Sequence, residues 1–434
     1  MANITPRRLP GFIELEPMKQ LQFDEMIDKI KGVFQLHCFV PLDTPVLELS
    51  EILLAKSGGD IDKEIYRFSK GSTDMCMRYD FTVPLARYVA MNINELSFPF
   101  KRYQIGKVYR GERPQKGRLR EFYQCDADII GSDSLPLPAD AECIALYKDC
   151  FNALGLNVVV EISDRNLLNG LIESLGLQDK TNEILVLLDK IDKIGKENVV
   201  DAIKELSISA NSAEKLVTLV SIKGSLSEVV GLIKNSCNTE SFVKGLNNLK
   251  EIDSYLNSFG VSQENYIFNL GIIRGHNYYT GTVFEAYLKD NRQLGALGGG
   301  GRFENLAGYY TDKKLPGVGM SIGLSRLYSL LSSNNLLPKP KTTLTKLLII
   351  PLGETINTCI SISTELIKNN INAEVAFEQR SFKNKLKEAN KRQIENILIV
   401  GEDEVNSKKY TLKNMSTGTQ ESLGLDDIIN KLRG

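Results

Sequence analysis

The residues best suited to chemistry in this sequence form a run of cations between two strand-like stretches. Residues 101–122 carry eight basic side chains and two acidic ones, which leaves a local excess of six positive charges. Forked guanidinium groups suit phosphate, so the run favours an anionic ligand. An ordinary solvated loop is the competing interpretation. The basic residues are Lys101, Arg102, Lys107, Arg110, Arg113, Lys116, Arg118 and Arg120.

Two polar clusters flank this basic run. Gln124, Asp126 and Asp128 follow it at alternate positions, and alternation in a strand places side chains on one side. Asp80 and Thr82 precede it. Taken alone, either aspartate is more often a satisfied structural carboxylate, so the chemistry of each cluster depends on what surrounds it.

Three later stretches also carry chemically suggestive patterns. Residues 274–281 begin with an arginine and contain two adjacent tyrosines. Glycines gather at 298–301, where the missing Cβ atoms let a ligand approach the backbone. Near the end of the chain, Lys383, Lys387 and Lys391 are four residues apart and would share one face of a helix. A solvated helix face is the alternative there.

Local sequence patterns predict the elements that must position these groups. Apolar residues three and four apart predict a helix over residues 18–34. Alternation predicts strands over 103–109 and 118–130, with Pro and Gly between them, and therefore a long β-hairpin with a basic tip. Further strands are predicted at 272–274 and 282–288, and leucine-rich helices at 184–194 and 216–233.

The length of 434 residues predicts two or three domains. Apolar runs at the C-terminal end alternate between strand and helix patterns, which predicts a small α/β domain with a parallel sheet. The expected parts are a first core segment (1–165), a helical insertion (166–260), a second core segment (261–331), a linker (332–344) and the C-terminal domain (345–434).

The composition narrows the class of protein. The net charge is -1 at pH 7, so any contact with nucleic acid must come from local basic patches. The seven cysteines show no metal-ligand spacing and the chain has two histidines, which predicts reduced thiols and no metal site. We expect a cytoplasmic protein without a membrane partner, because neither a signal peptide nor a membrane-spanning run is visible.

The hairpin sequence resembles the second signature motif of class II aminoacyl-tRNA synthetases, in its histidyl version. The resemblance covers residues 109–122. It implies that Arg110 grips the ATP α-phosphate, together with Arg118 as a further ATP ligand. It also implies that Glu112 holds the adenine amino group and that Phe122 stacks on adenine. A preorganised arginine suits this reaction, because negative charge develops at the α-phosphorus.

The two polar clusters resemble the amino-acid site of the same family. The resemblance implies that Asp80 and Thr82 bind the substrate ammonium, whereas Gln124 contacts the amino acid. Asp128 would then face the imidazole, and a carboxylate there is sensible because the histidine ring carries N–H donors.

Three further stretches resemble signatures of this family. Residues 274–281 resemble a histidyl-specific segment, which implies that Arg274 contacts the carboxylate and α-phosphate region and that Tyr278 and Tyr279 line the histidine pocket. Residues 317–327 resemble the third class II motif, which implies that Arg326 clamps ATP. Residues 299–304 resemble a further, glycine-rich signature, in which Phe303 and Glu304 stand where the family usually has Tyr and Asp. The other departures from the family pattern are His276, Asn277 and Ser325.

Partners also follow from the resemblance. Gln115 and Arg120 would approach the extra 5′ guanine of histidine tRNA, and the three lysines Lys383, Lys387 and Lys391 would contact tRNA from an anticodon-binding domain. Residues 43–48 resemble the first class II motif, which implies a homodimer. Magnesium is expected on the ATP phosphates, with no metal bound by the protein itself.

The implied fold is an α+β catalytic core, an antiparallel sheet flanked by helices, with a helical insertion and a C-terminal α/β anticodon-binding domain. The implied reaction joins L-histidine to ATP as histidyl-adenylate and then to the 3′ end of histidine tRNA. Two alternatives remain. One is a non-catalytic relative, such as a regulatory subunit of the first histidine-biosynthesis enzyme or a sensor of uncharged tRNA. The other is a prolyl, threonyl or glycyl synthetase, against which residues 274–279 argue.

Overall fold

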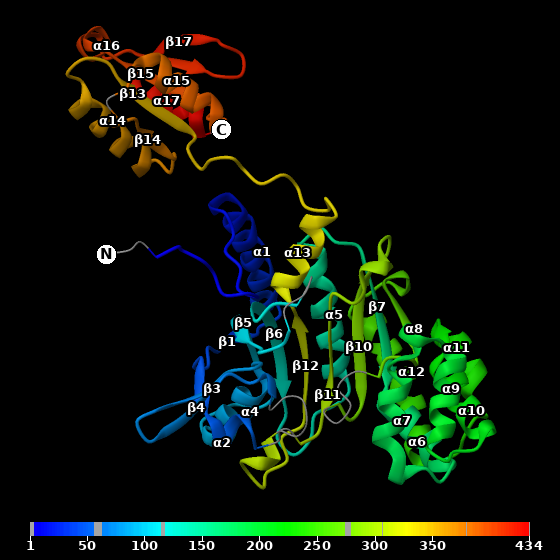
Figure 1. Cartoon of the computed structure of the whole chain (residues 1–434). Coiled ribbons are helices and arrows are strands. Elements are labelled where there is room, and N and C mark those ends of the chain that lie inside the picture. The colour runs from blue at the N-terminus through cyan, green and yellow to red at the C-terminus, as the bar shows by residue number, and fades with distance from the viewer. Residues whose placement is uncertain are drawn as a thin grey trace. The chain divides into compact units, whose positions relative to one another are not determined.

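A computed structural model describes residues 4–55, 63–113, 118–273, 279–305, 307–378 and 380–433 (Figure 1). The chain divides into two compact units near residue 337. The first is built mainly from Phe23–Leu337 and the second mainly from Pro338–Gly434. Within the described residues, no helix has both the length and the apolar character that a membrane span requires.

A nine-stranded sheet forms the centre of the first unit. The five pairings from β5 to β7 are all antiparallel, whereas β1 joins β5 and β9 joins β7 in parallel. This arrangement confirms the predicted antiparallel sheet. In order across the sheet, the strands are β1 (Val40–Pro41), β5 (Phe100–Tyr109), β6 (Glu121–Ile130), β12 (Gly317–Ile322), β11 (Gly298–Phe303), β10 (Thr282–Leu288), β7 (Val158–Asp164), β9 (Tyr266–Asn269) and β8 (Lys223–Gly224).

The predicted hairpin is formed by β5 and β6. Gly106 pairs with Gln124 and Tyr109 with Glu121, so the side chains that follow the hairpin tip lie at a fixed register along β6. The backbone N–H of Arg110 donates to Arg120 O over 2.9 Å and extends the pairing toward the tip. The strand begins at Glu121, three residues later than alternation had predicted.

Helices cover the sheet. The predicted N-terminal helix is α1 (Pro17–Leu36), whose buried Phe23 meets the ring of Tyr123 on β6 at 5.4 Å. Helix α5 (Pro138–Ala153) buries one apolar face against the sheet, and α13 (Leu324–Ser333) continues from β12 and packs against β6. A small three-stranded sheet stands beside α2 (Ser50–Leu53) and α4 (Thr82–Met91). Its strands are β2 (Leu47–Leu49), β4 (Thr73–Met77) and β3 (Arg67–Lys70).

The region from 165 to 258 is largely helical, as predicted, but its helices are shorter than the apolar runs suggested. The run at 216–233 is not one helix, because the short strand β8 interrupts it. Ser225 starts a new helix there with a capping box, in which its hydroxyl and the Glu228 carboxylate satisfy each other's backbone N–H groups. The helices are α6 (Arg165–Ser174), α7 (Thr181–Leu188), α8 (Ile191–Ile194), α9 (Lys196–Glu205), α10 (Ala210–Val220), α11 (Leu226–Ile233) and α12 (Glu240–Ser258).

The strand predicted at 272–274 is wrong for residues 272 and 273, whereas Arg274 lies outside the described residues. The strand in this region is β9, which ends at Asn269, and the Asn269 side chain then accepts from the N–H of Gly271 over 3.0 Å. Such a side-chain turn competes with strand pairing, which explains why the chain leaves the sheet here. Ile272 and Ile273 are buried although they lie outside a strand.

The second unit contains a five-stranded sheet in the order β14-β13-β15-β16-β17. The predicted parallel sheet is present in part: β14, β13 and β15 pair in parallel, whereas β16 and β17 are added in antiparallel pairings. The strands are β13 (Leu347–Pro351), β14 (Ala373–Val375), β15 (Asn396–Val400), β16 (Tyr410–Asn414) and β17 (Gln420–Leu423). The helices are α14 (Ile356–Lys368), α15 (Phe382–Lys391), α16 (Glu402–Ser407) and α17 (Leu425–Arg433).

Candidate functional site

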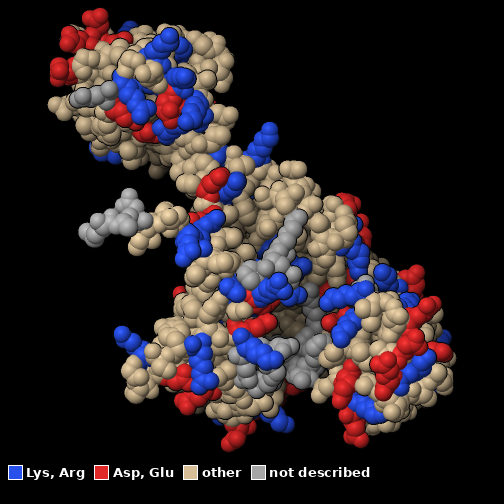
Figure 2. Space-filling view, in the orientation of Figure 1, with Lys and Arg blue, Asp and Glu red and all other residues tan. Residues whose placement is uncertain are grey.

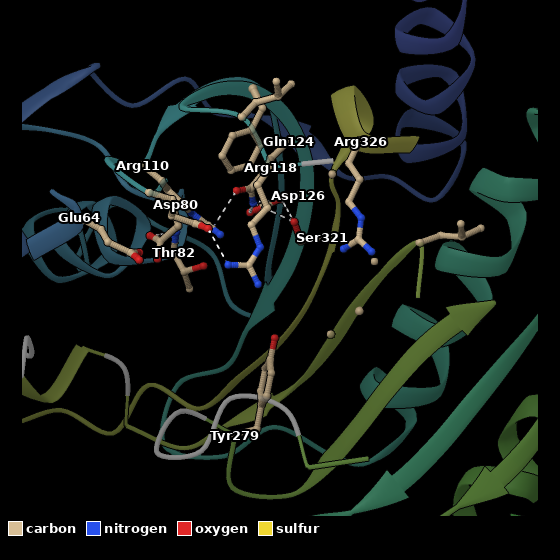
Figure 3. Close-up of a pocket in the computed structure, with 18 residues that line it drawn as sticks. Glu64, Asp80, Thr82, Arg110, Arg118, Gln124, Asp126, Tyr279, Ser321 and Arg326 are labelled. Carbon is tan, nitrogen blue, oxygen red and sulfur yellow. Dashed lines mark hydrogen bonds and ion pairs between the residues drawn. The ribbon is translucent and has the colours of Figure 1, made fainter. Parts of the chain in front are cut away.

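A cavity of about 720 Å³ opens on the sheet of the first unit (Figures 2 and 3). Its walls come from the hairpin, from the start of α4, from strands β6, β11 and β12, and from α13. The described residues that line it are Glu64, Asp80, Thr82, Arg110, Glu112, Arg118, Leu119, Phe122, Gln124, Asp126, Tyr279, Leu297, Gly298, Gly299, Gly300, Ser321, Gly323 and Arg326. Most of the residues predicted for ATP and the amino acid therefore meet in one place.

Arg110 is held in place from several sides. Its guanidinium donates to Tyr79 O at 3.3 Å and to Gln124 Oε1 at 3.2 Å. The same group lies over the Tyr79 ring at 4.4 Å and over the Phe122 ring at 5.1 Å. Aromatic faces attract cations, and side chains held this way lose little freedom when a ligand binds. Arg110 therefore presents a preorganised positive charge to the cavity.

Tyr79 and Glu64 support this arginine from behind. The Tyr79 hydroxyl donates to Glu64 Oε2 over 2.8 Å, and Glu64 O accepts from Gly111 N over 2.6 Å. Burial raises the pKa of Tyr79 well above its ordinary value, and the Glu64 carboxylate adds to the rise. The phenol therefore stays neutral and serves as a donor. Glu64 itself reaches the cavity, a position that no sequence motif had indicated.

The other hairpin residues fall into two groups. Arg118 Nη1 lies 3.3 Å from Glu112 Oε2, and both side chains line the cavity. Arg120 donates to Glu112 O over 3.0 Å and does not line the cavity, so it braces the hairpin. Three of the other described cations are neutralised by acids, because Lys101 pairs with Glu142, Arg102 with Asp128 and Lys107 with Glu121. The excess of positive charge counted along the sequence is thus smaller in the folded chain.

Asp80 and Thr82 reach the cavity from the start of α4 (Figure 3). Asp80 Oδ1 accepts the backbone N–H groups of Thr82 at 3.0 Å and Val83 at 3.1 Å. These bonds satisfy two of the first N–H groups of the helix. The carboxylate is therefore fixed as a helix cap while it faces the cavity, and the structural and the ligand-binding interpretations of Asp80 do not exclude each other.

A buried polar network lies on the cavity wall between β6 and β12. Gln124 Nε2 donates to Asp126 Oδ1 at 3.2 Å and to Ser321 Oγ at 2.9 Å. The Ser321 hydroxyl donates in turn to Asp126 Oδ1 at 2.5 Å. Burial raises the pKa of Asp126 to about 7, with a smaller contribution from Asp128. A carboxylic acid whose pKa is raised to near 7 at the wall of a cavity is typical of a functional site.

Asp128 lies two residues further along β6, away from the described lining of the cavity. It is 4% exposed and its Oδ2 atom lies 2.7 Å from Nη2 of the fully buried Arg102. Burial raises the pKa of Asp128, and Arg102 opposes the rise. A Cβ atom at Gly319, across the strand pair, would collide with the Asp128 carboxylate. In this structure Asp126, and not Asp128, reaches the cavity.

The far side of the cavity is built from the glycine strand β11. A Cβ atom at Gly300 would strike Gly319 O and the Phe284 ring, so glycine is required there for close packing of the sheet as well as for access to the cavity. Tyr279 and Arg326 line the cavity beyond this strand. Phe303, one of the departures from the family pattern, is 2% exposed and packs in a hydrophobic cluster away from the cavity lining.

Several predicted site residues are not tested by this structure. Gln115, Arg274 and Tyr278 lie outside the described residues, as do His276 and Asn277.

In the second unit, Lys383, Lys387 and Lys391 are exposed along α15. The neighbouring Arg392 is instead paired with Glu374, with Nη2 and Oε2 2.6 Å apart.

Sequence reasoning had missed Glu64 and Ser321 and had left Asp126 without a role. Glu64 belongs to no recognised motif, and only its approach to Tyr79 reveals it. Ser321 and Asp126 lie on paired strands and face each other in the register of β12 and β6. The alternation of Gln124, Asp126 and Asp128 was the one available signal for Asp126. In the part of the chain that the structure describes, no three His, Cys, Asp or Glu side chains are grouped to hold a metal ion.

Comparison with known proteins gives the family. Residues 11–327 match the model of histidyl-tRNA synthetase, and residues 346–434 match an anticodon-binding domain. The chain belongs to the histidyl-tRNA synthetase family. This membership confirms the predicted class II fold and the prediction of a histidine–tRNA ligase.

Individual relatives agree with this family over the whole chain. A histidine–tRNA ligase of Clostridium tetani is 43% identical over 99% of this chain and 98% of its own length. That of Finegoldia magna is 40% identical over 99% of this chain and 100% of its own. A crystal structure of histidyl-tRNA synthetase from Nostoc sp. PCC 7120 superposes with a TM-score of 0.90 at 31% identity, over 99% of both chains.

A more distant structure shares the fold alone. It is described as an ATP phosphoribosyltransferase regulatory subunit/histidyl-tRNA synthetase from Bacillus halodurans C. It superposes with a TM-score of 0.76 at 20% identity, over 92% of this chain and 99% of its own. Residues 346–434 of this chain match an anticodon-binding domain, which favours a synthetase over the regulatory alternative.

Proposed function

We propose that the cavity joins L-histidine to ATP as histidyl-adenylate and then passes the histidyl group to the 3′ end of histidine tRNA. The observation that carries the proposal is the position of Arg110. Its guanidinium is bonded to the Gln124 side chain, assigned to the amino acid, and lies over Phe122, assigned to adenine. If the histidine carboxylate attacks the α-phosphate, that phosphate must lie between the amino acid and adenine. Arg110 places its positive charge at this position.

The histidine end of the cavity is proposed to contain Asp80, Thr82, Gln124 and Tyr279, together with Tyr278. Asp80 supplies a carboxylate and Gln124 an amide oxygen, and both accept hydrogen bonds from an ammonium group. Asp128 stays a candidate for the imidazole. To bind the imidazole, the Asp128 carboxylate would have to give up or share its ion pair with Arg102.

The ATP end is proposed to contain Phe122, Glu112, Arg118 and Arg326, together with Arg274. Phe122 offers a ring face to adenine, and stacking of this kind does not depend on the edges of the base. Glu112 and Arg118 form an ion pair, and both side chains line the cavity. The Glu112 carboxylate would accept from the adenine amino group, and the Arg118 guanidinium would contact phosphate. Magnesium would enter with ATP, because Mg²⁺ is commonly held by substrate phosphates and one or two carboxylates.

The chemistry needs no covalent intermediate with the protein. The histidine carboxylate attacks the α-phosphorus, the bond to pyrophosphate breaks, and the terminal ribose hydroxyl of tRNA then attacks the activated carbonyl and releases AMP. Arg110, Arg274 and Arg326 would lower the barrier by stabilising charge on the phosphates and by holding the two substrates in line.

For tRNA, we propose two separate contacts. Gln115 and Arg120 on the hairpin would approach the acceptor end, and the exposed lysines Lys383, Lys387 and Lys391 of α15 would contact the anticodon region. Exposed lysines attract the phosphate backbone, and this attraction does not depend on the base sequence. A location in the cytoplasm, with the rest of translation, is part of the proposal.

We also propose a homodimer that uses the surface around Pro45. A second hollow of about 500 Å³ lies there, lined by Pro45, Leu49, Ile52 and Met91 among others. Leu49 is 46% exposed and Met91 is 71% exposed, and exposed apolar side chains grouped around one hollow favour an interaction surface. Sedimentation velocity would give a dimer mass, and a monomer at micromolar concentration would rule the dimer out.

The test of the proposed function is charging of histidine tRNA by the purified chain. Radiolabelled histidine should become acid-precipitable only when ATP and histidine tRNA are both present. Arg110→Lys should remove most of this activity while the melting temperature stays near that of the unaltered protein. Charging with proline, threonine or glycine in place of histidine would contradict the proposal.

A further inference from the structure

We propose that Asp126 and Ser321 are positioning residues that fix the orientation of the Gln124 amide, so that its oxygen faces the substrate ammonium. This inference rests on the proposed function of the cavity. It assigns roles to two cavity residues that the family resemblance left without one.

The first argument is the hydrogen-bond pattern around the Gln124 side chain. A primary amide has a donating and an accepting end, and which end points where is decided by its partners. The Nε2 end faces two oxygen atoms, Asp126 Oδ1 at 3.2 Å and Ser321 Oγ at 2.9 Å. The Oε1 end faces a donor, Arg110 Nη2, at 3.2 Å. Turning the amide over would set oxygen against a carboxylate and N–H against a guanidinium.

The second argument is burial. Gln124 is 6% exposed and Asp126 is 3% exposed, so water cannot readily replace a lost partner. A misplaced amide in such a site leaves a buried polar group unsatisfied, which is costly. The Ser321 hydroxyl donates to Asp126 at 2.5 Å, and it can accept from Gln124 only because its own proton is directed to the carboxylate. The two residues therefore act together.

The third argument is what the fixed amide presents to the cavity. A carbonyl oxygen has two lone pairs, so Gln124 Oε1 can accept from Arg110 and from one further donor. Asp80 and Thr82 line the same cavity. A substrate ammonium placed among them finds acceptors only if the Gln124 oxygen faces it. If the amide were reversed, its N–H₂ group would face the cation and repel it.

The orientation depends on the charge of Asp126. The charged groups that face it are Asp128 on the same strand, which raises its pKa, and Arg102 on β5, which lowers it, while β12 contributes the neutral Ser321. When Asp126 is ionised it can only accept hydrogen bonds, which selects one amide orientation. When it is protonated it can also donate, and the reversed amide becomes acceptable. The selection is thus strongest above the pKa of Asp126.

The test compares the unaltered protein with Asp126→Asn in histidine-dependent ATP–pyrophosphate exchange. The substituted amide has nearly the same shape as the carboxylate but can donate as well as accept, so it no longer selects the orientation of Gln124. At pH 8 we expect the KM for histidine to rise about tenfold, the effect of one lost hydrogen bond to a charged group. The KM for ATP should change by less than about threefold, because Arg110 keeps its contacts with Tyr79 O and with the rings of Tyr79 and Phe122.

The pH dependence separates this role from a merely structural one. The ratio of the two histidine KM values should fall from about ten at pH 8 toward about two at pH 6, because Asp126 is then largely protonated in the unaltered protein. Titration of the substrate's own imidazole affects both proteins equally and cancels in the ratio. A ratio that is the same at both pH values would overturn the proposal.

Two further variants complete the design. Ser321→Ala should raise the histidine KM about threefold, and adding it to Asp126→Asn should cost less than the product of the single effects, because both act on one amide. Asp253→Asn is the matched control, since Asp253 accepts from the Tyr266 hydroxyl over 2.8 Å and does not line the cavity. Unaltered protein without histidine-dependent exchange would refute the proposed function. Normal exchange with an unchanged KM in Asp126→Asn would refute only the present inference.

Discussion

The guanidinium of Arg110 and the amide of Gln124 form a single unit in which Nη2 donates to Oε1 over 3.2 Å. Each is also fixed independently, Arg110 by Tyr79 and Phe122, and Gln124 by Asp126 and Ser321. This contact joins the region assigned to the amino acid to the region assigned to ATP. Preorganised charge of this kind is the main means by which such a site lowers a barrier.

Replacing Arg110 should therefore affect the chemical step more than substrate binding. Arg110→Lys keeps a positive charge but loses the fork that contacts Gln124 and Tyr79 O together. We expect kcat of ATP–pyrophosphate exchange to fall about 10²–10³-fold. The matched control is Arg67→Lys on the exposed β3 strand, where the surface pair with Asp74 contributes little to stability or activity. Equal losses in both variants would contradict the assigned role.

The ring of Tyr79 should matter more than its hydroxyl. Tyr79→Phe keeps the aromatic face under Arg110 and removes only the bond to Glu64, so kcat should change by less than about threefold. Tyr79→Leu removes the face, which is typically worth about 1–2 kcal/mol for a partly desolvated cation. A loss of about tenfold in kcat/KM is expected for Leu. If Phe and Leu are equally impaired, the hydroxyl and not the ring supports the arginine.

The buried pair of Arg102 and Asp128 should be important for folding. Arg102→Met leaves an uncompensated carboxylate in a site with almost no exposure, which typically costs about 3–5 kcal/mol. Chemical denaturation of the first unit should show this loss as a lower midpoint. The Arg102→Met/Asp128→Leu double variant should recover much of the stability. A single variant as stable as the unaltered protein would show that the pair contributes nothing net.

The stability of the protein should depend on pH through the ionisation of Asp126. Its pKa is about 7 in the folded chain against an ordinary value of 3.8, so the folded state binds the proton more tightly than the unfolded state. The contribution of Asp126 to the free energy of unfolding is fully present below pH 3.8, where the carboxyl is protonated in both states. It is lost as the pH rises through 7, because the buried carboxyl then ionises. Asp126→Asn should therefore stabilise the ligand-free protein by up to about 4 kcal/mol at pH 8 and hardly at all at pH 4. Denaturation at the two pH values measures the difference, and an equal effect at both would refute this titration.

The lysines of α15 should act on tRNA alone. Replacing Lys383, Lys387 and Lys391 by Ala should weaken tRNA binding about tenfold at physiological salt and reduce its salt dependence. Lys368→Ala on α14 is the control, because that lysine already has a partner in Glu365 at 3.3 Å. Filter binding over a range of salt gives both quantities. ATP–pyrophosphate exchange, which needs no tRNA, reports whether the catalytic unit is intact.

The sequence allowed the sheet and the cavity to be anticipated where local signals are strong. Alternation and the Pro–Gly tip predicted the hairpin, and the hairpin brings Arg110 close to Gln124 because their strands must pair. Periodicity failed where a single residue starts or stops an element. Ser225 begins α11 inside an apolar run, and the Asn269 side chain ends β9 before the predicted strand.

Side-chain partners across strands could not be read from the sequence. Asp126 and Asp128 are equivalent by alternation, yet one faces the cavity and the other is paired with Arg102. What separates them is the neighbouring strands, which place Ser321 opposite Asp126 and Gly319 opposite Asp128. Glu64 is a similar case, because its role depends on a hydroxyl fifteen residues away. Such relationships arise from the packing of distant segments.

The most direct test of the central claim is ATP–pyrophosphate exchange by the purified chain, with each of the common amino acids supplied in turn. The cavity described above predicts exchange with histidine and only background with the others, and it predicts that Arg110→Lys abolishes most of the histidine signal. Absence of exchange with every amino acid, from protein shown to be folded, would contradict the claim that this cavity activates histidine.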